Sequence, residues 1–271
     1  MSPHGRPKGS YRSAEHEGTP VTALLDVRGL NKRFGGLVVT DRLDLQVQPR
    51  EIHALIGPNG AGKTTLVAQL AGQLASDSGT VHFGGEDITR LVAHQRARHG
   101  LLRSFQITRL FKSLSVRENV AFAVQAGQGR TFSAWAPVRR DARLIEQAQA
   151  VLERIGLAAR GDASIEQLSH GEQRALEVGL TLASRPLLVL LDEPMAGMGA
   201  QESAAMARLI EGLRDDCAVL LIEHDVDSVF RLADTVSVLV NGAIVASGRP
   251  DAVRNDPAVI AAYLGDAEDA S

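Results

Sequence analysis

The segment from Gly57 to Thr64 constrains the fold of this chain more than any other part of its sequence. It reads Gly-Pro-Asn-Gly-Ala-Gly-Lys-Thr and matches the pattern G-x-x-x-x-G-K-S/T. An apolar run over Ile52–Ile56 precedes it, and a helix is predicted over Thr65–Leu74. Glycines let the backbone amides of such a loop approach phosphate oxygens at the positive end of the following helix. The pattern therefore predicts a strand, a phosphate-binding loop and a helix, rather than an ordinary glycine-rich turn.

The residues of this phosphate loop (Gly57–Thr64) have distinct expected roles. The ammonium group of Lys63 neutralises the β- and γ-phosphates of a nucleotide, and the Thr64 hydroxyl is placed to bind Mg²⁺. The other residues expected to surround the phosphates are Gly57, Pro58, Asn59, Gly60, Ala61, Gly62 and Thr65.

Two adjacent carboxylates follow a second apolar run, Leu187–Leu191. A buried parallel strand that ends in this way presents both groups at the carboxyl edge of the sheet, beside the phosphate loop. We expect Asp192 to hold Mg²⁺ directly or through water, and Glu193 to orient the attacking water and accept its proton. The alternative is that the two residues only cap the next helix.

The composition is that of an ordinary globular protein. The 271 residues are 44% apolar and 23% charged, and 29 basic against 32 acidic residues give a formal net charge of −3. This balance argues against a disordered chain and gives no basis for nucleic-acid binding. The single cysteine, Cys217, excludes an intramolecular disulfide and is typical of a reducing compartment.

No apolar run has the roughly 18 to 20 residues that a membrane-spanning helix needs. The polar residues 1–20 contain no apolar stretch, so they do not resemble a signal peptide, and they predict a disordered tail. We therefore expect a cytosolic chain.

Short apolar runs and amphipathic segments alternate along the chain, which predicts an α/β fold. Alternating apolar residues predict strands with one exposed face at Leu43–Val47 and Val81–Phe83. The dipeptide at 241–242, Asn-Gly, predicts a hairpin between two β-rich runs. The remaining predicted strands are Ala218–Ile222, Thr235–Val240 and Ala243–Ala246. Helices are predicted over Asn119–Ala126, Asp141–Ile155 and Glu172–Ser184, so a helical block of residues 104–184 interrupts the α/β pattern.

The hexapeptide at 168–173 reads Leu-Ser-His-Gly-Glu-Gln, which is a short polar segment before a predicted helix. By itself it is also a helix capping box, because Glu172 follows Ser169 by three residues. It resembles the LSGGQ signature of the ATP-binding subunits of ABC transporters. With the phosphate loop before it and the paired carboxylates after it, the chain resembles such a subunit over residues 24–264.

The resemblance implies a role for several further residues. Ser169, Gly171 and Glu172 belong to the signature loop (Leu168–Gln173), which in this family faces the nucleotide of a partner subunit. Gln106 matches the family's Q-loop, whose amide contacts Mg²⁺ or the attacking water, and His224 matches the histidine that contacts the γ-phosphate.

The resemblance also implies an adenine site. Phe34 matches the aromatic residue that stacks on the adenine ring, and Val39 is expected to pack beside it. The alternative for Phe34 is an aromatic residue in the core of a hairpin.

Two departures from the family pattern point to one subfamily. His170 replaces the first glycine of the signature, and Gly199 stands where most relatives carry an aspartate after the carboxylate strand. Both resemble the branched-chain amino acid importers, as do the segments 108–111 and 263–265.

The resemblance implies a P-loop NTPase (RecA-like) α/β core with an antiparallel β-subdomain and an inserted α-helical subdomain. Residues 1–20 are then a tail, 21–265 a single ABC ATPase domain and 266–271 an acidic tail. The implied cofactors are ATP and Mg²⁺. The implied partners are a second ATP-binding subunit, transmembrane permease subunits and, for an importer, an external substrate-binding protein. The subunit would lie on the cytoplasmic face of the membrane.

Two other functions remain open at this point. One is an exporter ATPase of the lipopolysaccharide-export type, and the other is a soluble ABC ATPase acting in DNA repair or translation. The stretch from Arg90 to Arg117 carries seven Lys and Arg residues and no acidic one. It is either a solvated face or the surface that approaches the membrane partner.

Overall fold

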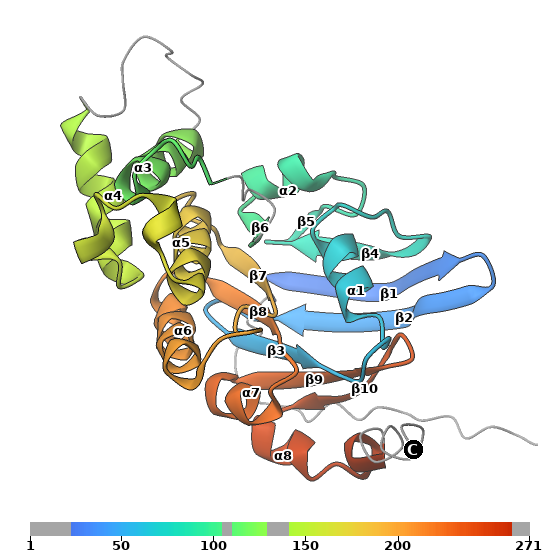
Figure 1. The fold of residues 1–271 in the computed structure, drawn as a ribbon. Helices are drawn as coiled ribbons and strands as arrows, with labels where there is room; N and C mark the ends of the chain where they lie inside the picture. The colour runs from blue at the N-terminus through green and yellow to red at the C-terminus, as the bar shows by residue number, and fades with distance from the viewer. Residues whose placement is uncertain (1–22, 105–109, 129–140, 262–271) are drawn as a thin grey trace, which may run out of the picture.

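The computed structural model describes residues 23–104, 110–128 and 141–261, which form two β-sheets with helices packed around them (Figure 1). The larger sheet has six strands in the order β10-β9-β3-β8-β7-β6. Its neighbouring strands are parallel, apart from the antiparallel pair β9 and β10. The strands are β3 (Ile52–Ile56), β6 (Leu101–Arg103), β7 (Leu188–Asp192), β8 (Ala218–Ile222), β9 (Thr235–Val240) and β10 (Ala243–Gly248).

The central strands of this sheet are buried on both faces. Every residue of β3 and β8 is buried, which explains why their sequences are continuous apolar runs without alternation. Successive residues of β8 enter two different cores: Leu220 packs on the side of helix α1 (Lys63–Leu70), and Leu221 packs on the side of α6 (Ala200–Gly212). Helices thus cover the sheet on both faces, in agreement with the predicted α/β fold.

The smaller sheet is antiparallel, with the order β2-β1-β4-β5. Alternate residues such as Leu25 and Val27 on one strand, and Val81 and Phe83 on another, are buried, so one face packs on the core. This confirms the predicted antiparallel β-subdomain. The strands are β1 (Leu25–Phe34), β2 (Leu37–Val47), β4 (Ser78–Phe83) and β5 (Glu86–Asp87).

A group of three helices, α3, α4 and α5, lies at the opposite end of the molecule from the β1–β2 hairpin (Figure 1). It has a core of its own, which includes Val120, Leu152 and Leu176. The helices are α3 (Val116–Gly127), α4 (Ala142–Arg154) and α5 (His170–Leu182). All three were expected from the sequence, and their observed ends differ from the predicted ends by only a few residues.

The helical group connects two strands that are neighbours in the sheet, since Leu101–Arg103 pairs in parallel with Leu188–Leu190. It is therefore an enlarged crossover connection, whose last helix, α5, leads back into β7. A crossover helix runs antiparallel to the strands that it joins, so the N-terminus of α5 lies towards the carboxyl edge of the sheet.

Several local predictions are corrected or refined. Helix α1 ends at Leu70 rather than Leu74, because Gly72 has a φ of 72° and the chain turns there. The predicted hairpin is present, with φ values of 47° at Asn241 and 80° at Gly242. The other helical segments are α2 (Ala93–Arg98), α7 (Val226–Leu232), α8 (Pro250–Arg254), η2 (Ala158–Arg160), η3 (Ile165–Gln167) and η4 (Leu213–Asp215).

The basic stretch from Arg90 to Arg117 is not one uniform surface, because one of its seven basic residues is buried. Arg96 is buried and donates hydrogen bonds to four backbone carbonyls, those of Gln69, Leu70, Thr89 and Leu91. Two of these carbonyls belong to the last residues of α1, which leave their oxygens without helical partners. Burial lowers the pKa of Arg96 to about 10, so the side chain stays charged.

Within the described ranges, no helix is both long and apolar enough to cross a membrane.

Candidate functional site

The phosphate loop connects β3 to α1 and packs against two other strands. Gly57 has a φ of 152° and Gly62 a φ of 103°, and a Cβ at either position would collide with a backbone carbonyl, that of Leu239 or that of Val39. The amide of Gly242 donates a hydrogen bond of 3.0 Å to the carbonyl of Ala61. The loop is thus fixed by its glycines and by neighbouring backbone, as a loop that cradles phosphate requires.

Lys63 lies over this loop. Its Nζ donates hydrogen bonds to the carbonyls of Gly57 and Pro58, at 2.6 and 2.9 Å. Burial lowers the pKa of Lys63, and the carboxylates of Glu193 and Asp192 oppose this shift. Thr64 and Thr65 follow in the first turn of α1, where backbone amides have no partner within the helix and are available to an anion.

The paired carboxylates stand at the carboxyl end of β7, as expected from the sequence. Asp192 is the last residue of the strand, and its Oδ2 accepts a hydrogen bond of 2.5 Å from Nη2 of Arg103. The other arm of that guanidinium donates to Oε1 of Gln73, at 2.6 Å. Glu193 follows with a φ of 49°, a left-handed backbone that is unfavourable for a side chain with a Cβ, and its amide donates to the carbonyl of Ile222.

His224 follows β8, the strand between β3 and β7, and its side chain is 62% exposed. The preceding residue, Glu223, is 1% exposed and accepts hydrogen bonds from the amides of Met195 and His224. Burial raises the pKa of Glu223. This buried carboxyl therefore ties the segment after Glu193 to the segment that carries His224.

Phe34 ends β1 and is 51% exposed, so the alternative of a buried hairpin aromatic is wrong. Nζ of Lys32 lies 5.5 Å from the centre of its ring. The backbone of Val39 lies against Gly62, which places this part of the β-subdomain beside the phosphate loop.

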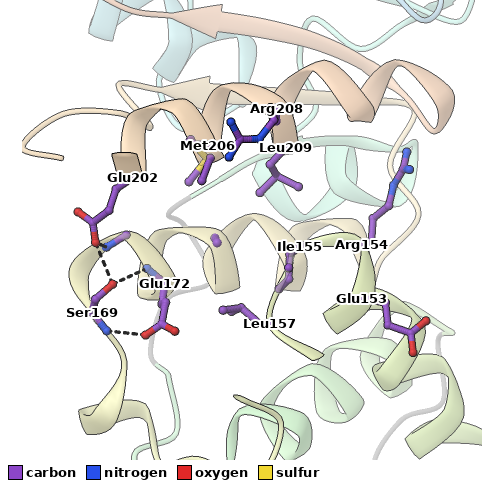
Figure 2. Close-up of a pocket in the computed structure, with 14 residues that line it drawn as sticks. Glu153, Arg154, Ile155, Leu157, Ser169, Glu172, Glu202, Met206, Arg208 and Leu209 are labelled. Carbon is purple, nitrogen blue, oxygen red and sulfur yellow. Dashed lines mark hydrogen bonds between the residues drawn. The ribbon is translucent and has the colours of Figure 1, made fainter. Parts of the chain in front are cut away.

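The signature loop forms a second group of residues, shown in Figure 2. Ser169 is the N-cap of α5: its Oγ accepts from the amide of Glu172, and its own amide donates to Oε2 of Glu172. Ser169 Oγ also donates a hydrogen bond of 2.9 Å to Oε1 of Glu202, on α6. The amide of Gly171 donates to the same oxygen at 3.2 Å. These residues line one end of a pocket of about 430 Å³ between the helical group and α6.

The structure thus brings the predicted residues into two groups. Lys63, Asp192, Glu193 and His224 gather at the carboxyl edge of the large sheet. Ser169, Gly171 and Glu172 form the other group, at the N-terminus of α5. Gln106, the segments 108–109 and 263–265 and both tails lie outside the described residues.

Oxygen donors for Mg²⁺ exist in the first group, namely the Thr64 hydroxyl and the Asp192 carboxylate, and such hard donors fit this ion. Across the described part of the chain, no three His, Cys, Asp or Glu side chains converge on a metal site. The residues therefore fit a Mg²⁺ that is held partly by the nucleotide.

Three residues form hydrogen bonds within these two groups but were not among the predicted site residues: Arg103, Glu202 and Glu223. The partners of Arg103 and Glu202 come from distant parts of the chain, 89 and 33 residues away, so no local pattern marks them. The position of Glu223 next to His224 is the one signal that the sequence offers.

Comparisons with known proteins agree with this geometry. Residues 40–196 match the family model described as ABC transporter, and residues 243–269 match that of the branched-chain amino acid ATP-binding cassette transporter. The chain is 39% identical over 252 residues to the high-affinity branched-chain amino acid transport ATP-binding protein LivG of Escherichia coli K12, and covers 98% of it with 90% of its own length. It is 38% identical to BraF of Pseudomonas aeruginosa, with the same coverage of both chains.

Solved structures give the same result. The ADP conformation of MJ1267, an ATP-binding cassette of an ABC transporter, superposes with a TM-score of 0.79 at 28% identity, covering 90% of this chain and 99% of that one. A nucleotide-free ATP-binding cassette from an ABC transporter gives a TM-score of 0.78 at 27% identity, covering 89% and 99%. Sequence and fold agree over nearly the whole length, and the chain therefore belongs to the ABC transporter family, as one of its ATP-binding, ATP-hydrolysing subunits.

Proposed function

We propose that this subunit hydrolyses MgATP to power the import of branched-chain or related amino acids through separate membrane subunits. The observation that carries the proposal is the juxtaposition of Lys63 on the phosphate loop with Asp192 and Glu193 at the end of β7. The names of LivG and BraF, and the match of residues 243–269, support the cargo class.

Within one subunit, the phosphate loop and Lys63 bind the β- and γ-phosphates, while Phe34 stacks on adenine with Val39 beside it. Thr64 and Asp192 would hold Mg²⁺, which neutralises developing charge on the phosphates, and Gln106 would contact the ion or the attacking water. For Asp192 to do so, its hydrogen bond with Arg103 must open. Glu193 then accepts a proton from water, and His224 contacts the γ-phosphate.

Each site is completed by a second ATP-binding subunit. Ser169, the Gly171 amide and Glu172 lie in a separate group, at a helix N-terminus that suits an anion. We assign to them the γ-phosphate of the nucleotide that is bound by the facing chain. ATP would then join two such chains, identical or related, face to face.

The remaining partners are transmembrane permease subunits and, because the subfamily is one of importers, an external substrate-binding protein. The docking surface is proposed at residues 107–113, which in the sequence link β6 to the helical group. Lys112 is exposed there, and its nearest acidic partner is Glu166 at 3.6 Å. The subunit would work on the cytoplasmic face of the membrane.

Two experiments test these proposals. ATP should drive dimers of Glu193→Gln, measured by light scattering, and Ser169→Arg should abolish them by placing bulk and charge in the interface. A stable monomer with full ATPase activity would contradict the shared site.

For docking, Arg109→Glu with Lys112→Glu should reduce transport in vesicles while the ATP affinity of the isolated subunit stays unchanged. A matched charge reversal at the exposed Arg42, on the β-subdomain, is the control. Normal transport by the double variant would contradict the proposed surface.

A further inference from the structure

Glu202 makes an unusual pair of contacts across the boundary between the helical group and the core. It lies in the first turn of α6, and its Oε1 accepts two hydrogen bonds from the signature loop, one from Ser169 Oγ and one from the Gly171 amide. Figure 2 shows its carboxylate pointing at this loop from the neighbouring helix. The donors lie 33 and 31 residues away in the sequence, so the contact is a tertiary one.

These two donors are the groups that the proposed function assigns to the γ-phosphate of the facing chain. A carboxylate oxygen and a phosphate oxygen accept the same kind of hydrogen bond at a helix N-terminus, and both are anionic. They cannot use the same donors at once, and two like charges at one helix end repel each other.

We propose that Glu202 is an internal latch: without nucleotide it occupies the phosphate-binding donors of the signature loop, and ATP must displace it to join two chains. The proposal rests on the shared-site function described above. Glu202 then competes with the γ-phosphate for Ser169 Oγ and the Gly171 amide.

The surroundings of Glu202 suit a contact that can open. Hydrogen bonding from Ser169, followed by that from Gly171, lowers the pKa of Glu202, so the carboxylate is charged at neutral pH. Glu172 is engaged separately, by the amide of Ser169 and by Nε of Arg160 at 3.1 Å. Release of Glu202 therefore leaves the helix cap itself intact.

The test uses Glu193→Gln chains, in which bound ATP persists. Glu202→Gln keeps the size of the side chain and removes its charge, whereas Glu202→Ala removes the acceptor as well. The matched control is Glu211→Gln, which removes one exposed charge from the other end of the same helix. The measurement is the ATP concentration at half-maximal dimerisation, by light scattering.

We expect both Glu202 variants to dimerise at an ATP concentration roughly tenfold lower than the Glu193→Gln parent, because a charged competitor is lost. The Glu211 control should match the parent. Amide hydrogen exchange at Gly171 in the nucleotide-free monomer should become faster in the Glu202 variants alone.

Two results would overturn the latch. If both Glu202 variants need as much ATP as the control, or more, Glu202 does not compete with nucleotide while the shared site stands. If the Glu193→Gln parent forms no dimer with ATP, the shared site and the latch both fail.

Discussion

The two halves of the proposed nucleotide site are built in different ways. The phosphate-loop half stands at the ends of buried parallel strands. There, main-chain hydrogen bonds hold the loop and the strand that ends in Asp192. The signature half stands on one helix end and depends on side chains of Ser169, Glu172 and Glu202, all on the surface. The first half is fixed by the sheet, whereas the second is fixed by contacts that water or a ligand can replace.

In each half, a side chain of this protein contacts groups that the proposed function assigns to a ligand, Mg²⁺ in the first half and the γ-phosphate in the second. Arg103 neutralises Asp192 within the core, and Glu202 occupies the signature loop from across a subdomain boundary. In the proposed function, ATP binding needs only a local side-chain rearrangement at the first half, where Arg103 contacts Asp192. At the second half it needs a change in the contact between α6 and the signature loop.

The largest expected effect comes from cavities placed in the two cores. Leu221 and Leu152 are both fully buried, one in the core sheet and one in the helical group, and truncation to Ala typically costs about 2–5 kcal/mol. We expect Leu221→Ala to weaken ATP binding by the monomer. We expect Leu152→Ala to spare that binding and to weaken ATP-driven dimerisation.

Cys217 reports which core has opened. Burial raises its pKa to about 12, so the thiol should resist alkylation in the native chain at pH 8. Leu221→Ala should accelerate its alkylation more than Leu152→Ala does. Equal acceleration, with a single shared unfolding transition, would show that the core of the sheet and the core of the helical group unfold as one cooperative unit.

The next largest effect is expected on catalysis, from a change in the phosphate-loop half. Glu193→Gln removes the proposed base and keeps its volume, so turnover should fall by roughly 10² or more while ATP binding persists. The assay is ATP hydrolysis by the assembled transporter, with the exposed Glu146→Gln as the control. Near-normal turnover would remove Glu193 from this role.

Lys63→Ala should affect binding rather than turnover. Loss of a charged partner for phosphate costs roughly tenfold to a hundredfold in ATP affinity. A direct nucleotide titration measures this on the monomer, and Lys112→Ala is a matched loss of an exposed lysine. An unchanged affinity would mean that the loop backbone alone holds the phosphates.

The smallest expected effect separates capping from nucleotide recognition. Ser169 and Ser115 are N-caps with the same capping box, on α5 and α3, and replacing either with Ala should cost about 1 kcal/mol in the free energy of unfolding. Only Ser169→Ala should also weaken ATP-driven dimerisation. If Ser115→Ala weakens it equally, the signature serine acts through helix stability alone.

Local patterns made the phosphate loop, the paired carboxylates and the helices α3, α4 and α5 predictable from the sequence, whereas α6 was not predicted. The apolar strands, the glycine turns and the hairpin at Asn241 are each determined by residues that are adjacent in the sequence. Strand β6 could not be predicted in the same way, because Leu101–Arg103 is too short to show a period.

The contacts of Arg103, Glu202 and Glu223 could not be predicted from the sequence either, because they form only after distant segments have packed together. A basic stretch looks uniform in the sequence, yet Arg96 turns inward to cap α1 while Lys112 faces solvent. Charge counted along a chain does not reveal which side chains find buried carbonyls.

Helix α5 has the geometry of a lever arm. Its C-terminal end is tied to β7 through the short segment 183–187, and its N-terminal end carries Ser169. Thirteen helical residues span about 20 Å, so a rotation of about 10° about the tied end would move Ser169 by roughly 3 Å. That displacement is comparable to the length of the hydrogen bond to Glu202, so a small angular change at the base of the arm is enough to make or break it.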